Sequence, residues 1–122
     1  MTRLDKDEER EERIHMEITV DAYGPEEQAI GWYNYLDDTL QFPCSARCVV
    51  RRATSPLEPR EEVKVVGMAP AEECKHDMLV LIRWKRRQLA VPLMQLEGIQ
   101  VDEETQQAIE DWHYWVDRGY EL

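Results

Sequence analysis

The sequence lacks several features that would assign it to a common class directly. No apolar run approaches the ~20 residues of a membrane-spanning helix, and no secretory signal precedes the acidic start, so we expect a soluble cytoplasmic protein with no membrane partner. It has only three cysteines, in no tight spacing, which argues against a disulfide scaffold. It contains neither a glycine-rich phosphate loop nor an H-E-x-x-H motif, and we therefore expect no enzymatic activity.

Basic residues are also few. The chain has 15 lysines and arginines against 26 aspartates and glutamates, a formal net charge of −11, so phosphates would be repelled and we expect no nucleic-acid partner. The charge is distributed unevenly along the chain. Residues 1–42 carry −8 and residues 99–122 carry −6, whereas residues 43–98 carry +3. Two acidic segments therefore flank a mildly basic middle.

Hydrophobic periodicity divides the 122 residues, which we expect to form one domain, into three parts. Residues 1–40 predict a helical hairpin, with a first helix continuing to about Tyr23 and a break at Gly24 and Pro25. From residue 42 to 101 the period changes to two, which predicts four or five short strands in a small SH3-like antiparallel β-barrel. Residues 102–119 predict a C-terminal helix with Asp102 as N-cap. The expected fold class is α+β.

The segment WYNYLDDTLQFP joins the predicted hairpin to the first predicted strand. It places Asp37 and Asp38 where the second helix should end, and the last carbonyls of a helix already carry about half a negative charge. A hard cation such as Ca²⁺, which takes about six to eight oxygen ligands, would relieve this repulsion. From spacing alone, however, two solvated acids at a helix end are the more common explanation.

Further acids recur in the predicted turns. Asp21 precedes the Gly24-Pro25 break and Glu26 follows it, while Glu72 and Glu73 lie in a loop between strands. Together with Asp37 and Asp38, these are our candidate calcium ligands. No segment matches an EF-hand loop, so the ligands would have to converge from separate turns.

Two other interpretations compete with calcium binding. Three cysteines and one histidine could bind zinc, but their spacing favours buried structural thiols (Cys44, Cys48, Cys74 and His76). The basic turn of residues 83–87, with Trp84 among its cations, could serve a protein- or RNA-interaction module. A charged hairpin that neutralises the acidic helices explains the same turn, and we prefer that explanation because of the net charge.

The sequence resembles the cyanobacterial calcium-binding protein family CcbP over nearly its whole length. The resemblance rests on ERIHMEITVDAYGPEEQAIGWYNYLDDTLQFP, SPLEPREEVKVVGMAP, RQLAVPLMQLE and AIEDWHYWVDRGY. It implies a small acidic protein without EF-hands that binds and sequesters Ca²⁺, as a buffer or sensor linked to heterocyst differentiation. It also implies that the family's key calcium-binding aspartate corresponds to Asp38. One departure is Cys44, where the family has an aromatic residue, and this should alter packing more than metal binding.

Overall fold

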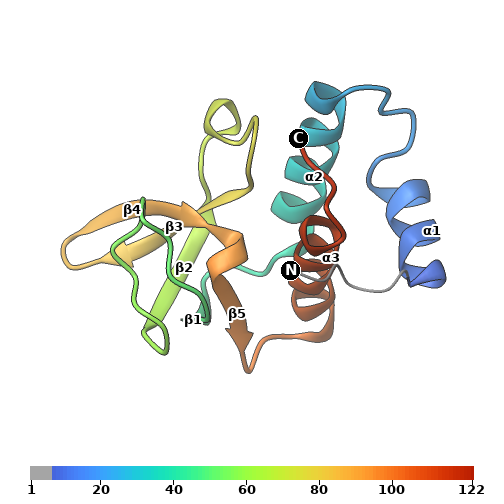
Figure 1. Cartoon of the computed structure of the whole chain (residues 1–122). Helices are drawn as coiled ribbons and strands as arrows, with labels where there is room; N and C mark the ends of the chain where they lie inside the picture. Colours follow the sequence, from blue (N-terminus) through green and yellow to red (C-terminus); the bar gives the residue numbers. More distant parts are fainter. Residues whose placement is uncertain (1–6) are drawn as a thin grey trace.

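The computed structural model describes residues 7–122 and arranges them as a layer of helices beside an antiparallel sheet (Figure 1). The α+β class and the order of elements are those expected from the sequence. The helices are α1 (Glu8–Glu17), α2 (Pro25–Thr39) and α3 (Glu103–Asp117). The strands are β1 (Cys44–Cys48), β2 (Glu62–Met68), β3 (Leu79–Trp84), β4 (Arg87–Pro92) and β5 (Leu96–Ile99), with short 3-10 turns η1 (Ala71–Glu73) and η2 (Leu93–Gln95).

The first helix is shorter than its sequence pattern predicts. It ends at Glu17, and the expected continuation to Tyr23 is wrong because the chain turns back at once toward α2. The turn includes Asp21 with a left-handed φ of 56°. Gly31 of α2 lies so close to this turn that a Cβ placed there would be 2.3 Å from the Ile18 carbonyl oxygen. A glycine therefore permits the tight approach of the two segments.

The helices share an aromatic core. Trp32 of α2 packs against Trp112 and Trp115 of α3, with ring centroids 5.1 and 5.6 Å apart. The α1 helix contributes the buried Ile14, followed by the buried Ile18 at its C-cap. These aromatic rings join the second helix to the last.

The five strands form one sheet in the order β4-β3-β2-β1-β5, with every pair antiparallel. The edge strands β4 and β5 do not pair, so the sheet is curled but open and not a closed barrel. Pro92 ends the edge strand β4, where a missing N–H costs no ladder hydrogen bond. The β3–β4 turn projects away from the helices (Figure 1).

Candidate metal centre

The C-terminal end of α2 carries both predicted aspartates in solvent. Asp37 and Asp38 are exposed, and the last turn of the helix contains no basic residue. The amide of Gln41 would ordinarily extend the helix by bonding the Asp37 carbonyl, but it donates to Thr105 Oγ of α3 at 3.0 Å. This leaves a backbone oxygen beside two carboxylates, at the negative end of the helix dipole. The arrangement offers oxygen atoms to a cation without any competing positive charge in that turn.

Tyr33 lies one turn before Asp37, on the same face of α2. Its hydroxyl donates a hydrogen bond to the Ala69 carbonyl, at 2.8 Å, just before η1. Burial raises the pKa of Tyr33, and the negative charges of Asp37 and Glu72 raise it further. The hydrogen bond joins α2, which carries Asp37, to the segment just before η1, which carries Glu72. Glu73 is exposed next to Glu72 on the same 3-10 turn.

The other two predicted ligands lie at the opposite end of α2. Asp21 is exposed in the α1–α2 turn and Glu26 is exposed in the first turn of α2. Asp38 is twelve residue steps along the helix from Glu26, which amounts to roughly 18 Å along the axis. Because calcium–oxygen distances are about 2.3–2.6 Å, one ion cannot bind to both ends. The predicted set thus divides into two separate groups.

Neither group is a preassembled cage. Within residues 7–122, no three histidine, cysteine, aspartate or glutamate side chains are placed to hold one metal ion. A Ca²⁺ ion at the exit of α2 would therefore need carbonyl or water oxygens, or a movement of a neighbouring loop, to complete its shell.

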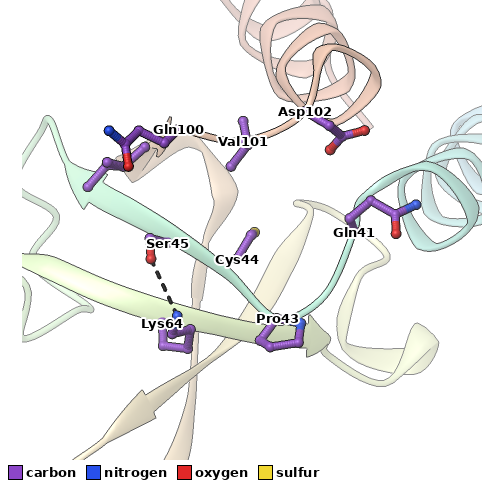
Figure 2. Close-up of a pocket in the computed structure, with 9 residues that line it drawn as sticks. Gln41, Pro43, Cys44, Ser45, Lys64, Gln100, Val101 and Asp102 are labelled. Atoms are coloured by element: carbon purple, nitrogen blue, oxygen red, sulfur yellow. Dashed lines mark hydrogen bonds between the residues drawn. The ribbon is translucent and has the colours of Figure 1, made fainter.

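A cavity of about 610 Å³ adjoins this exit, and no sequence pattern indicated it. Figure 2 shows Asp102, the N-cap of α3, on the same side of the cavity as Gln41, which follows α2. The Asp102 side chain makes no capping hydrogen bond, so its carboxylate remains available. Lys64 contributes a positive charge at the other side, 3.5 Å from Ser45 Oγ. Sequence analysis identified Asp102 only as a helix cap, because no local signal reveals that α3 begins where α2 ends.

The cysteines are occupied in other ways. Cys48 and Cys74 are buried, and their thiols bond the carbonyls of Val50 and Leu79 at 3.3 and 3.6 Å. Burial raises the pKa of both thiols, which disfavours the thiolate form that zinc requires. The preference for structural cysteines over a zinc site fits this geometry.

Comparison with known proteins places the chain in a class of calcium-binding proteins. The family model described as calcium binding, CcbP, matches residues 12–116. The chain belongs to this CcbP family, and Ca²⁺, the predicted ion, is the family's ligand.

Two solved structures are similar over their whole length. The crystal structure of Anabaena CcbP is 43% identical, with 100% of both chains covered and a TM-score of 0.88. A calcium-binding protein in its calcium-binding form is 42% identical, again with 100% of both chains covered and a TM-score of 0.87. Among curated proteins, none matched this sequence. In the described part of the chain, no helix has the length and apolar character needed to cross a bilayer.

Proposed function

We propose that this chain binds Ca²⁺ reversibly at the exit of α2, with Asp38 as the anchoring carboxylate and Asp37 beside it. The observation that carries the proposal is the combination of two exposed carboxylates with a helix C-terminus that has no cation in its last turn. Thr105 strengthens this combination because it accepts the Gln41 N–H and leaves the Asp37 carbonyl free for an ion. Membership of the CcbP family supports calcium as that ion.

The remaining ligands come from the segments that flank this helix end. The Tyr33 hydroxyl bonds the Ala69 carbonyl two residues before η1, and this contact between α2 and the η1 segment supports the proposal that Glu72 and Glu73 contribute oxygens when the loop closes on the ion. Asp21 and Glu26, at the far end of α2, are proposed as a second and separate acidic site. Water molecules complete both shells, since calcium accepts irregular coordination more readily than magnesium does.

In the cell, we assign the protein the role of a cytoplasmic calcium buffer or sensor, of the type that regulates heterocyst differentiation. Its similarity to the Anabaena protein and its excess of acidic residues support this role. A buffer would change little on binding, whereas a sensor would alter its exposed surface. Tryptophan fluorescence distinguishes the two, because Trp32 lies on the same helix as Asp38, six residues before it, and packs against Trp112 and Trp115.

Isothermal titration calorimetry with CaCl₂ tests the site. Asp38→Asn should lower the affinity of the main site at least about tenfold, because it removes one charged oxygen donor from a partly hydrated ion. The matched control is Asp117→Asn, which removes one exposed carboxylate from the last turn of α3 and should leave the affinity within about twofold. If both substitutions give the wild-type titration, the Asp38 site is wrong. If the folded wild type gives no calcium heat, the function itself is wrong.

Thermal denaturation supplies an independent measurement. A ligand that binds only the folded state at 100 times its dissociation constant stabilises it by about 2.7 kcal/mol. Ca²⁺ should therefore raise the melting temperature of the wild type, and Mg²⁺ at the same concentration should raise it much less, since Mg²⁺ keeps its own water molecules.

A further inference from the structure

The turn between β3 and β4 gathers positive charge that the calcium site does not use. Five exposed cations lie on this hairpin and on the neighbouring strand β2, and we call them the basic tip: Lys64, Arg83, Lys85, Arg86 and Arg87. None of them makes an ion pair within residues 7–122, although the chain carries 26 acids. Cations elsewhere, such as Arg13 and Arg47, do pair with carboxylates. The sequence-based explanation, that this turn neutralises the acidic helices, is therefore not supported by its contacts.

Strand register brings the five cations together. Lys64 pairs with Ser45, and the next residue, Val65, pairs with Ile82, so alternation places Lys64 and Arg83 on the outer face of the sheet. These two side chains and Lys85 line one shallow depression. Arg87 pairs with Trp84 across the two-residue turn of Lys85 and Arg86.

One carboxylate, Glu62, also lines the depression, but it lies 3.8 Å from Arg47 Nη2. Lys85 holds a left-handed φ of 58°, a conformation usually given to glycine or asparagine. A lysine there retains a charge at the apex of the turn that those residues would not supply. The depression therefore remains positive after the one acid among its lining residues is counted.

Four of the five cations of the basic tip, all except Lys64, which also lines the cavity beside Asp102, are well separated from the acidic helices. The start of β3 lies next to α3, because the Leu93 amide bonds the Met78 carbonyl at 2.9 Å and His113 contacts the Leu93 carbonyl at 3.1 Å. From there, five residue steps along β3 place the turn roughly 17 Å away. Figure 1 shows the turn at the opposite side of the molecule from α1. This separation exceeds the Debye length of about 10 Å at 0.1 M salt, so the net charge of −11 does not cancel the field at the tip.

We propose that the basic tip docks on the surface of an anionic lipid bilayer, although the sequence alone predicted no membrane partner. A planar surface contacts the projecting turn while the acidic helices stay on the far side, whereas a flexible nucleic acid would also encounter the helices. The only aromatic residue of the turn, Trp84, is partly buried against the core, so the tip offers no stacking platform for bases. Clusters of four to eight Lys and Arg beside a membrane helix or on an amphipathic helix bind acidic lipid headgroups, and the basic tip presents a similar number of cations on a hairpin.

Vesicle co-sedimentation of the full chain tests this proposal. The vesicles contain phosphatidylcholine with 40% phosphatidylglycerol, or phosphatidylcholine alone, in 0.1 M NaCl with EDTA so that calcium cannot bridge the protein to the lipid. Only the phosphatidylglycerol vesicles should carry the protein down. The double variant Lys85→Gln/Arg86→Gln should lower the partition coefficient about 30-fold, which is about fivefold for each cation removed near the surface.

The matched control is Arg51→Gln/Lys75→Gln, which removes two exposed cations outside the tip and changes the net charge equally. It should bind within about twofold of the wild type. Circular dichroism confirms that both variants fold. The proposal is overturned if the wild type binds both vesicle types equally or neither, or if the control loses as much binding as the tip variant. It is also overturned if the wild type binds a 20-nucleotide RNA but not the vesicles, because the tip would then be a nucleic-acid surface. Calcium is absent throughout, so the result does not depend on the proposed calcium site.

Discussion

Substitution of Arg13 by methionine should strongly destabilise the fold, because it removes the main partner of a buried carboxylate. Asp111 of α3 is 0% exposed, and both of its oxygens accept hydrogen bonds from the Arg13 guanidinium at 2.6 and 2.8 Å. The Tyr35 hydroxyl donates a third bond at 2.9 Å, and Arg10 Nε lies 3.5 Å away. The hydrogen bond to Asp111 raises the pKa of Arg13. Burial, and after it the negative charge of Asp111, raises the pKa of Tyr35.

The magnitude follows from the burial of this pair. Leaving one member of a buried ion pair without its partner costs about 3–5 kcal/mol. Arg13 itself is 25% exposed and Arg10 can move closer to Asp111, so we expect about 2–4 kcal/mol for Arg13→Met. A domain of this size has a total stability of about 5–15 kcal/mol, so the loss is large. It should appear as a fall of roughly 10 °C in melting temperature.

Urea denaturation followed by tryptophan fluorescence measures this loss, since α1 is bonded to the α3 helix that carries Trp112 and Trp115. The control is Arg51→Met, which breaks an exposed pair with Glu58 at 3.9 Å and should change the free energy of unfolding by less than about 0.5 kcal/mol. The double variant Arg13→Met/Asp111→Leu removes both charges and should recover most of the stability. A loss below about 1 kcal/mol for Arg13→Met would refute the reasoning, as would a double variant that is no more stable than the single one.

Two further predictions concern backbone packing and pH. Gly31→Ala should lower the free energy of unfolding, measured by urea denaturation, by about 1–3 kcal/mol, because the new Cβ would meet the Ile18 carbonyl. The control Gly67→Ala should not destabilise the protein, because no atom lies within 4 Å of the new Cβ. Equal effects of the two substitutions would contradict this. Burial raises the pKa of Asp77 above its ordinary 3.8, so ionising this side chain at neutral pH lowers the stability of the fold. The stability that the protonated form provides is complete below pH 3.8, and it is lost as the pH rises through the folded-state pKa. Asp77→Asn should therefore be more stable than the wild type at pH 7 and no more stable at about pH 3, and a less stable variant at pH 7 would contradict this.

Much of the fold follows from local signals in the sequence. The Gly24-Pro25 break, the change from period 3.6 to period 2 and the acid-rich start of the last helix predict three helices and four or five strands, and the structure has five strands in the expected order. Closure of the sheet was not predictable, because it depends on whether β4 and β5 meet, and neither strand carries a residue pattern that specifies its partner. The early end of α1 escaped prediction for a similar reason. Ile18 fits both a helical stripe and a strand-like alternation, and neither pattern reveals that the chain turns there against Gly31 of α2.

The candidate site was less accessible to sequence analysis than the fold. Asp37 and Asp38 could be identified because a helix end has a defined polarity, which makes two acids there unusual. Their neighbours come from other parts of the chain. Thr105 and Asp102 reach the same place only because α3 packs along α2 through the tryptophan core.

Asp111 is another residue whose role could not be predicted from the sequence. It lies in an acidic helix and looks like one more solvated carboxylate, yet it is fully buried and bonded to α1 and α2. Exposed and buried acids therefore have different roles in this chain: Asp111 is neutralised by Arg10 and Arg13 and fixes the helices, while Asp37 and Asp38 lack a cation in their own turn and retain their charge. That difference in pairing is one reason why we propose the exit of α2 as the calcium site. The same criterion, applied to cations, selects the basic tip.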